Sequence, residues 1–562
     1  MMRALASASV FPCPDFSKGG PANGLEAGHN QVTAPQFALD RESFMTLNNH
    51  FKIGILLTMS LLAACNQSTL FENQMPTEPF RPAYHFTPPT AWMNDPNGMV
   101  YYDGEYHLFY QYYPEDIVWG PMHWGHAVST DLVNWQHLPI ALAPDELGYI
   151  FSGSAVIDWQ NTAVFGPEAM VASYTYHDAS ARQSQAIAYS LDKGRTWTKY
   201  AGNPVIPTPP NIRNFRDPKL IWYEDGSGSG HWVMVLAAGS AVLFYTSPNL
   251  IDWEPSGSFG FGQGSTAGVW ETPDLFELPV EGSAKTRWVL TVGLGDHAPA
   301  GGSGTQYFVG DFDGQTFTNE NPKETILWAD YGADFYAAQS WSDAPDGRRI
   351  WLAWMSNWQY ATKTPTSTWR SAMTLPRELR LVQTEAGIRL GQTAVPELTQ
   401  LRQSEKSWQN LTLEPGVPFV PEIGGELLEI VAEFETPVEA NRLGLRVRVG
   451  DGAGTAVGYA PKSNTLFVDR TNAGQSDFYE NFARNHTVIY EPSDGVLKLH
   501  IFVDRSSVEV FADDGLINFT EQIFPDETDI GLELFAEGTA VTVRNLQIYQ
   551  LSPAQFLPQP GS

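Results

Sequence analysis

Residues 91–114 read AWMNDPNGMVYYDGEYHLFYQYYP. The first part holds an acid, Asp95, between Asn94 and Pro96 and follows it with a Pro-Asn-Gly turn, and the second part is an aromatic-rich stretch that predicts strand. This pattern indicates a carboxylate held at the edge of a strand. An ordinary Asx-Pro turn, common in all-β proteins, is the alternative, and these residues alone do not separate the two interpretations.

A repeated unit follows this stretch, and each copy consists of a strand end, a polar turn and an aromatic residue. The copies end at Trp135, Trp197, Trp253 and Phe317, which are separated by 62, 56 and 64 residues. Each interval has room for four short strands and their turns. This spacing is typical of a β-propeller.

Residue types that carry chemistry recur with nearly the same spacing. Asp95, Ser152, Asp217, Glu271 and Asp334 are separated by 57, 65, 54 and 63 residues. If each lies where the innermost strand of a blade begins, five blade starts converge on one central depression. The sequence therefore predicts one shared pocket.

The expected fold class is all-β, with a five-bladed β-propeller followed by a C-terminal β-sandwich. The 49 glycines, 40 prolines and 13% aromatic residues suit many short strands and tight turns, and alternating strand patterns continue to the C-terminus. The sandwich either packs against the propeller or binds carbohydrate. The expected segments are an over-extended N-terminus with a lipoprotein signal peptide (1–65), a tether (66–82), the propeller (83–385), a linker (386–425) and the sandwich (426–552).

The two cysteines, Cys13 and Cys65, form no plausible pair within the folded part. The apolar run before Cys65 follows Lys52 and is too short for a comfortable membrane span, which is typical of a secretory signal. Leu62-Ala63-Ala64-Cys65 resembles the bacterial lipoprotein signal, in which the cysteine is acylated; Met45 is then the natural start. Asn66 favours an outer-membrane or cell-surface anchor, and periplasmic or secreted export is the alternative.

The net charge of −30 and the pI near 4.7 argue against nucleic acid, because phosphate binding needs a basic face. A neutral ligand fits better, and the 18 tryptophans suit stacking on sugars as well as filling β cores. His123 and His126 lack a third metal ligand. We expect no metal and no organic cofactor. We expect attachment to a membrane only through the lipid anchor on Cys65.

Two further motifs resemble the one around Asp95: NFRDPK at 214–219 and WETPDLF at 270–276. Each places an acid, Asp217 or Glu271, close to a proline at a strand start. Three acids in one water-poor pocket cannot all stay ionised cheaply, so one is expected to have a raised pKa. Glycoside cleavage needs a carboxylate, a protonated acid and a stabilising group. A Ca²⁺ site is the rival use of clustered acids.

The motifs WMNDPNG, FYQYYP, WGPMHWGHA, FSGSA, FRDPK and WETPDLF together resemble glycoside hydrolase family 32, the invertases, inulinases and levanases. The resemblance covers about residues 84–551. The stretches GGSGTQYFVGDFDG, ADFYAAQSW and WLAWMSNWQYA are more similar to bacterial levanases and fructan β-fructosidases than to plant or yeast invertases.

This resemblance implies that Asp95 is the nucleophile, Glu271 the acid/base and Asp217 the transition-state stabiliser. The family retains anomeric configuration, so the carboxyls of Asp95 and Glu271 are expected about 5–5.5 Å apart. The implied substrate-binding residues are Trp92, Asn94, Gln111, Trp119, Phe151, Ser152, Arg216, Asp334 and Trp354.

Thr272 departs from the family pattern, because many members have cysteine after the acid/base glutamate. Its hydroxyl either forms a hydrogen bond that shifts the pKa of Glu271, or simply fills the same small space.

The expected function is that of a retaining exo-β-fructofuranosidase, which removes terminal fructose from levan or inulin and from sucrose. The alternatives are a transfructosylase and a catalytically inactive surface glycan-binding lipoprotein. The sequence leaves the linkage preference and the oligomeric state open.

Overall fold

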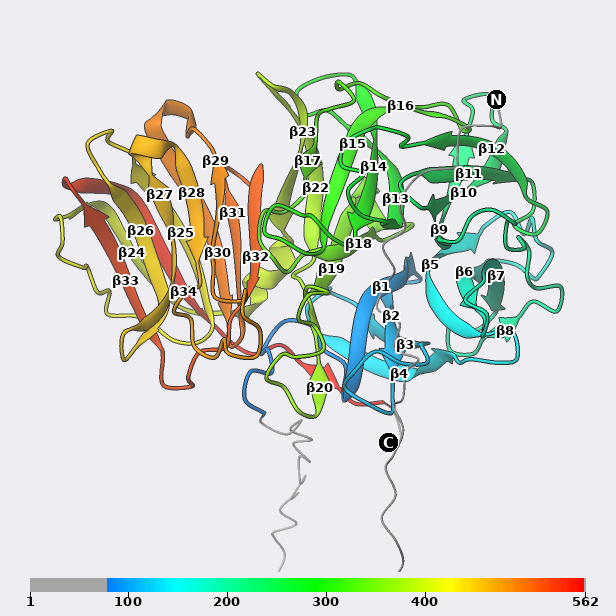
Figure 1. Ribbon diagram of the computed structural model, residues 1–562, viewed down its shortest axis with the longest axis horizontal. Coiled ribbons are helices and arrows are strands. Elements are labelled where there is room, and N and C mark those ends of the chain that lie inside the picture. The colour runs from blue at the N-terminus through cyan, green and yellow to red at the C-terminus, as the bar shows by residue number, and fades with distance from the viewer. Residues whose placement is uncertain (1–77, 560–562) are drawn as a thin grey trace, which may run out of the picture. The chain divides into compact units, whose positions relative to one another are not determined.

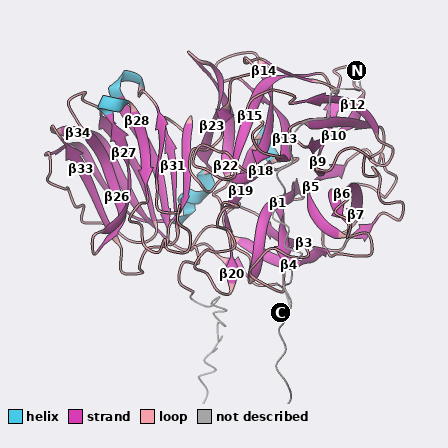
Figure 2. Ribbon diagram, viewed as in Figure 1, coloured by secondary structure: helices cyan, strands magenta, loops and turns pink. Residues whose placement is uncertain are grey.

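The computed structural model describes residues 78–559, which are built almost entirely from β-strands (Figures 1 and 2). Within that range the only helices are short 3-10 helices: Pro345–Gly347, Pro396–Leu401, Pro461–Ser463 and Ser493–Gly495. None of the helices in 78–559 is long and apolar enough to span a membrane. The all-β prediction is confirmed. Cys13, Met45 and Cys65, with the predicted signal peptide and most of the predicted tether, lie outside the described residues.

Five sheets are built from residues 91–394 together with one short C-terminal strand, and the first of them begins with the stretch quoted above. It has the order β20-β1-β2-β3-β4-β35, and its strands are β1 (Ala91–Tyr102), β2 (Glu105–Tyr113), β3 (His123–Ser129), β4 (Trp135–Leu142), β20 (Trp369–Arg370) and β35 (Phe556–Leu557). The two short edge strands run parallel to their neighbours, and the others are antiparallel.

The other four sheets follow in chain order. The second contains β5 (Tyr149–Asp158), β6 (Ala169–His177), β7 (Gln183–Ser190) and β8 (Thr198–Lys199), and the third β9 (Phe215–Glu224), β10 (Gly230–Ala238), β11 (Val242–Ser247) and β12 (Glu254–Phe259). The fourth contains β13 (Trp270–Pro279), β14 (Thr286–Leu294), β15 (Gly304–Phe312), β16 (Phe317–Asn319) and β17 (Leu327–Trp328). The fifth contains β18 (Tyr336–Ser340), β19 (Ile350–Met355), β21 (Ala372–Met373), β22 (Arg377–Thr384) and β23 (Gly387–Ala394).

The first strands of these sheets contact one another in a closed ring, β1 to β5, β5 to β9, β9 to β13, β13 to β18 and β18 back to β1. Separate apolar cores fill the spaces between neighbouring sheets. Phe109 and Tyr174 belong to one such core, and Ile187 and Leu236 to the next. Burying a side chain of this size contributes about 2 kcal/mol. This is the arrangement of a β-propeller, with its first strands around the axis.

The repeated unit forms the turn that joins the third and fourth strands of four sheets. These turns lie between β3 and β4, β7 and β8, β11 and β12, and β15 and β16. The carboxylate of Asp131 accepts hydrogen bonds from the backbone N–H groups of Val133 and Asn134 at 3.0 and 2.8 Å. The indole N–H of Trp135 then donates to the backbone oxygen of Leu132 at 3.1 Å. Trp197 and Trp253 donate to the residue three positions earlier in the same way, at 3.0 and 2.9 Å. A local side-chain-to-backbone turn therefore explains the repeat.

Two further sheets pack face to face as a β-sandwich. One has the order β24-β34-β25-β30-β31-β32, namely β24 (Arg402–Leu413), β34 (Val541–Leu551), β25 (Leu428–Glu435), β30 (Val496–Asp504), β31 (Ser507–Ala512) and β32 (Ile517–Gln522). The other has the order β29-β28-β27-β26-β33, namely β29 (Asn485–Ile489), β28 (Thr465–Asp469), β27 (Ala453–Ala460), β26 (Arg442–Gly450) and β33 (Gly531–Glu537). One apolar core joins both sheets. The predicted propeller followed by a sandwich is confirmed.

The range 386–425 differs from the linker that the sequence predicts. Residues 387–394 form β23 of the fifth propeller sheet, and residues 402–413 form β24, which pairs with β34. Only 395–401 connects the two sets of sheets. β24 is an edge strand whose polar side chains are mostly exposed, so its sequence RQSEKSWQNLTL lacks the apolar alternation of a half-buried strand.

Buried ionic contacts join the propeller to the sandwich. Arg377 of β22 forms ion pairs with Asp330 at 3.1 Å and with Glu509 of β31 at 2.5 Å. His85, which precedes β1, is bonded to Asp504 at 2.7 Å and to Glu509 at 3.0 Å. Arg81, at the end of the predicted tether, is buried as well and donates to Thr87 at 2.9 Å. The sandwich therefore packs against the propeller through paired charges, which buried charges require.

Candidate active site

Each of the five first strands contains a β-bulge close to its beginning. The pairing register shifts at 93–96 in β1, at 150–153 in β5, opposite 216–219 in β9, at 271–274 in β13 and at 336–339 in β18. Asp95 and Ser152 lie inside two of these bulges and Asp217 inside a third. A bulge bends the strand and re-aims its side chains, and it also accommodates a proline within a sheet. The acid-and-proline motifs in the sequence therefore correspond to β-bulges at one end of the ring of first strands.

Asp95 is buried and held by two donors. The hydroxyl of Ser152 donates to one carboxylate oxygen at 2.6 Å, and the side-chain amide of Asn94 donates to the other at 3.0 Å. The indole N–H of Trp92 donates to the amide oxygen of Asn94 at 2.7 Å, which fixes the orientation of that amide. Burial raises the pKa of Asp95, the two donors lower it, and Glu271 raises it again.

Asp217 lies close to both other acids, Glu271 and Asp95. Burial raises its pKa to about 7; Arg216 opposes this shift, while Glu271 and Asp95 add to it. One carboxylate oxygen accepts the backbone N–H of Thr272 at 2.9 Å. The sequence predicts that one of the three clustered acids has a raised pKa. In the structure the pKa values of both Asp95 and Asp217 are raised, that of Asp217 to about 7.

Glu271 is more accessible than the two aspartates, with 22% of its side chain exposed. One carboxylate oxygen accepts two hydrogen bonds from Arg216, at 2.5 and 3.2 Å, and the other accepts the hydroxyl of Tyr336. Arg216 is itself held by the side-chain oxygens of Asn214 at 2.9 Å and Gln183 at 3.3 Å. Glu271 therefore has a fixed position between a guanidinium and a phenol.

Aromatic side chains surround these polar groups. Trp92 and Trp354 are fully buried, with ring centroids 6.2 Å apart, and Trp358 lies within 6.0 Å of Trp92 and 4.8 Å of Trp354. The indole N–H of Trp354 has no hydrogen-bond partner among the described residues. Phe151 is partly buried and packs edge-on against Trp119, which is 41% exposed.

Gln111 is buried beside this group, and its side-chain amide donates to the backbone oxygen of Ile150 at 3.0 Å. This bond ties β2 to the beginning of β5, next to Ser152. With Gln111, the structure brings together at one end of the ring the three predicted catalytic acids and the predicted pocket residues Trp92, Asn94, Ser152, Arg216 and Trp354.

Asp334 does not join this cluster, which corrects its assignment to the sugar pocket. It is fully buried, and its carboxylate accepts hydrogen bonds from Tyr360 at 2.6 Å, Arg470 at 2.7 Å and the backbone N–H of Gln522 at 2.8 Å. Two of these partners belong to the sandwich. Asp334 therefore holds the two sets of sheets together.

His123 and His126 have separate hydrogen bonds. His123 donates to the backbone oxygen of Pro121 at 2.9 Å, and His126 contacts His107 at 3.1 Å. Burial lowers the pKa of all three histidines. No group of three or more His, Cys, Asp or Glu side chains within residues 78–559 is arranged to hold a metal ion.

Comparison with known proteins places this arrangement. The model of the Glycosyl hydrolases family 32 N-terminal domain matches residues 85–393, and that of the family 32 C-terminal domain matches 397–550. The chain belongs to glycosyl hydrolase family 32.

Its family 32 relatives include the levanase of Bacillus subtilis (strain 168), which is 54% identical over 506 residues, covering 88% of this chain and 73% of that protein. The extracellular exo-inulinase of Aspergillus awamori is 39% identical over 525 residues, 84% of this chain and 95% of that protein. A crystal structure of the exo-inulinase from Aspergillus awamori superposes with a TM-score of 0.79 at 38% identity, covering 85% of this chain and 99% of that chain. The predicted family is confirmed, and the protein is a glycoside hydrolase.

Tyr336, like Trp358, belongs to this family 32 site but is not among the residues that the sequence predicts. It is the first residue of β18, it is buried, and its hydroxyl contacts Glu271. The spacing of strand starts pointed to this region and selected Asp334, two residues earlier. Tyr336 lies 65 residues after Glu271, so the spacing fits it as well. An acid was expected from residue type, and the spacing alone did not distinguish the two positions.

Proposed function

We propose that this family 32 protein is a retaining exo-β-fructofuranosidase, which hydrolyses terminal fructose from levan- or inulin-type fructans and from sucrose. The observation that carries the proposal is the group of three acids at the bulges of three first strands: Asp95 in β1, Asp217 in β9 and Glu271 in β13. The names of its relatives, levanase and exo-inulinase, support a fructan as the substrate.

In this proposal Asp95 attacks the anomeric carbon of the terminal fructosyl unit. The hydrogen bonds from Ser152 and Asn94 stabilise its ionised form and fix the direction of attack. Glu271 donates a proton to the leaving oxygen and then accepts one from water, and its partial exposure suits this exchange. Arg216 and Tyr336 keep its carboxyl in position.

Asp217 stabilises the oxocarbenium-like transition state through hydrogen bonds to the fructose hydroxyls. A carboxyl with a pKa of about 7 is able to donate as well as accept such a bond. The proposed substrate-binding residues are Trp92, Asn94, Gln111, Trp119, Phe151, Ser152, Arg216 and Trp354. Asp334 is not among them, because sandwich residues occupy its carboxylate.

The test is a time course of the purified protein on levan, inulin and sucrose, each alone, with the products resolved by size. Fructose as the first product supports exo-hydrolysis, and new linkages at early times would indicate a transfructosylase instead. Asp95→Asn and Glu271→Gln are expected to lower kcat by about 10³-fold or more. Binding without turnover in the wild-type protein would favour the inactive glycan-binding alternative.

The stereochemical part of the proposal has its own measurement. A retaining enzyme requires about 5–5.5 Å between the two reacting carboxyls, and it releases fructose first in the anomeric form that the substrate had. Proton or carbon NMR of the first product, taken before mutarotation, distinguishes the two outcomes. Inverted fructose at the earliest time would refute the assignment of Asp95 as nucleophile.

We also infer that the protein is exported and anchored through a lipid on Cys65. The sequence around Cys65 supports this inference, and one of the relatives is named as extracellular. Labelling of expressing cells with a fatty-acid analogue tests it. The label should be present in the wild-type protein and absent in Cys65→Ser; an unlabelled wild-type protein would leave periplasmic or secreted export.

A further inference from the structure

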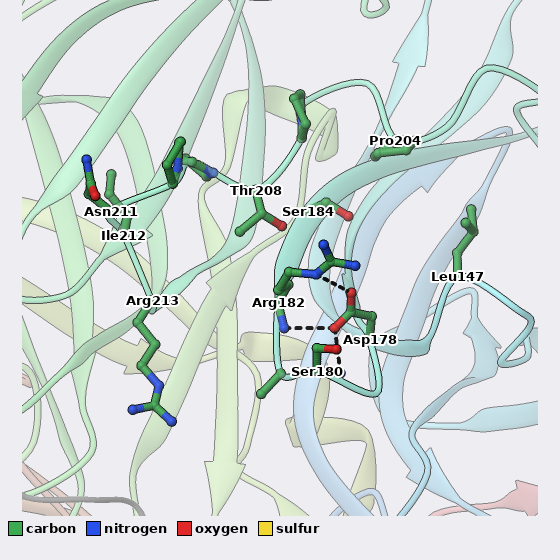
Figure 3. A pocket seen from close by; sticks show the side chains of 14 residues that line it. Leu147, Asp178, Ser180, Arg182, Ser184, Pro204, Thr208, Asn211, Ile212 and Arg213 are labelled. Atoms are coloured by element: carbon green, nitrogen blue, oxygen red, sulfur yellow. Dashed lines mark hydrogen bonds and ion pairs between the residues drawn. The ribbon is translucent and has the colours of Figure 1, made fainter.

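An open groove of about 900 Å³, called the cavity below, lies at one end of the second sheet (Figure 3). Its walls come from the 178–182 loop between β6 and β7, from residues 204–213 that precede β9, and from Leu147. Figure 3 shows Leu147 and Arg213 at opposite sides of this space. A volume of this size is in the range of ligand sites. None of its lining residues belongs to the proposed catalytic or substrate-binding set.

The cavity opens at the same end of the propeller as the three acids. His177 pairs with Tyr149 across β5 and β6, and with Gln183 across β6 and β7, so these residues mark the end of the sheet at which Phe151 and Ser152 lie. The wall formed by 204–213 continues directly into Arg216, which binds Glu271. The residues that line the cavity are therefore close to the catalytic group both in the sequence and at this end of the second sheet.

A row of aromatic rings leads from one to the other. Trp119 packs against Phe151 at 5.9 Å, Phe151 stacks on His177 at 4.5 Å, and Tyr149 stacks on His177 at 6.4 Å. Trp119 and Tyr149 are 41% and 38% exposed. Exposed rings of this kind offer an apolar face together with a polar edge, which suits the faces of sugars.

Local contacts and prolines shape the two walls of the cavity. The carboxylate of Asp178 accepts the backbone N–H groups of Ser180 and Arg182 at 2.8 and 3.0 Å and pairs with the guanidinium of Arg182 at 2.7 Å. The opposite wall contains Pro204, Pro207, Pro209 and Pro210. A preformed site loses less conformational entropy when it binds.

The polar side chains around the cavity suit a neutral, hydroxyl-rich ligand. Ser184, Thr208 and Asn211 offer uncharged donors and acceptors, and the exposed guanidinium of Arg213 adds donors that can bind sugar hydroxyls. The one carboxylate in the lining, that of Asp178, is already paired with Arg182. A cation would therefore find no free acid here.

We propose that this cavity is a subsite for fructosyl units of a long fructan that lie several residues away from the bond being cleaved. The inference rests on the proposed function and names its substrate class, a polymer or long oligosaccharide. The terminal fructosyl unit occupies the group of acids, the following units cross the aromatic row, and more distant units enter the cavity. Sucrose is too short to reach it. Levan and inulin share this chemistry.

Thr208→Trp tests the proposal by filling the cavity. Thr318→Trp, on the exposed face of the outer strand β16, is the matched control. Thr208→Trp is expected to lower kcat/KM about fivefold or more on levan or inulin, and less than about twofold on the shortest substrate that the enzyme accepts. The control should change neither value. Equal loss on long and short substrates, or no loss on either polymer, would overturn the proposal; measuring levan and inulin separately identifies which polymer uses the cavity.

Binding distinguishes a failure of this proposal from a failure of the proposed function. Calorimetry on Glu271→Gln with levan and inulin oligosaccharides of increasing length should show an affinity that keeps rising beyond the first few units. Thr208→Trp in the same background should remove this rise, and Asn211→Ala should weaken it without the bulk of tryptophan. An affinity that does not rise with length refutes the subsite even in an active enzyme. A wild-type protein that releases no fructose refutes the function, while the length dependence still decides the subsite.

Discussion

At the scale of single residues, ionisation of the buried Asp217 carboxyl destabilises the folded protein. Its pKa is raised to about 7, chiefly by burial, from the usual 3.8. Between about pH 4 and pH 7 the folded protein therefore holds a proton that the unfolded chain has released. A raised carboxyl pKa makes the folded state less stable as the pH rises through this window. Catalytic groups often carry such a cost, because the site needs a charge where folding does not.

Asp217→Asn is expected to raise the free energy of unfolding at pH 7.5 by about 1 to 3 kcal/mol and to flatten its pH dependence between pH 4 and 7. The amide oxygen can still accept the backbone N–H of Thr272, and only the long ion pair with Arg216, at 3.8 Å, is lost. Urea unfolding at pH 4, 5.5 and 7.5 measures both effects, and turnover should disappear in the same variant. A variant that is less stable than the wild type at pH 7.5 would contradict this account.

The sequence leaves open whether the Thr272 hydroxyl forms a hydrogen bond that affects Glu271 or only fills space, and its contacts bear on this question. Its side-chain hydroxyl is buried and has no hydrogen-bond partner among the described residues, whereas its backbone N–H binds Asp217. The hydrogen bond from Thr272 to Asp217 is therefore independent of the Thr272 side chain.

Thr272→Cys should accordingly leave both limbs of the pH–rate profile within about 0.2 pH units of the wild type. Its free energy of unfolding should stay equal or rise by up to about 1 kcal/mol, because a buried hydroxyl without a partner is replaced by a less polar thiol. The profile is measured as kcat/KM against pH. A displacement of the limb of half a unit or more would mean that the hydroxyl acts on Glu271.

At the scale of elements, the turn after β3 depends on one carboxylate. Asp131 accepts hydrogen bonds from Val133, from Asn134 and from the hydroxyl of Ser129. Burial is the largest single influence and raises the pKa of Asp131, yet the hydrogen bonds together lower it. The stabilisation is therefore present above the unfolded pKa near 3.9 and is lost as the pH falls through the lower folded value.

Asp131→Ala should lower the free energy of unfolding at pH 7 by about 1 to 3 kcal/mol, since several backbone N–H groups lose their acceptor. The difference from the wild type should shrink below about pH 4. Glu146→Ala, which removes an exposed acid, is the control and should change stability by less than about 0.5 kcal/mol. Equal effects of the two substitutions in chemical denaturation would show that the turn does not depend on Asp131.

The sequence predicted these turns because their signal is local. The side-chain hydrogen bonds of Asp131 and Trp135 reach residues at most three positions away, so the same pattern recurs wherever the same turn recurs. The acid-and-proline motifs are local in the same sense, because a proline inside a strand implies an irregular pairing. The polar edge strand β24 has no such signal, so its sequence predicts a linker instead of a strand.

At the scale of the whole molecule, the junction of propeller and sandwich is a set of buried charges. His85 lies between Asp504 and Glu509, and all three side chains are fully buried. Burial alone lowers the pKa of His85, but the hydrogen bonds and charges of the two acids raise it to about 9. The stabilisation from this histidine is complete below the unfolded pKa of 6.5 and is lost as the pH rises towards 9.

His85→Gln should therefore lower the free energy of unfolding by about 3 kcal/mol at pH 6 and by much less at pH 9. His297→Gln, the same change at a side chain that is 61% exposed, is the control and should have little effect at either pH. Unfolding in urea at pH 6, 7.5 and 9 provides the comparison. Parallel pH curves for wild type and His85→Gln would exclude a charged histidine at this junction.

The sequence by itself determined the all-β class, the repeat, the family and the three acids, because each rests on short patterns of neighbouring residues. Only the tertiary structure decided that Asp334 serves the sandwich and that Tyr336 meets Glu271, and it also supplied the partner of β24 and the cavity at one end of the second sheet. These features depend on residues far apart in the chain: Asp334 and Arg470 are 136 positions apart, and β24 pairs with a strand that begins at Val541. Such contacts form when sheets pack, and no local pattern specifies which distant side chain will be there.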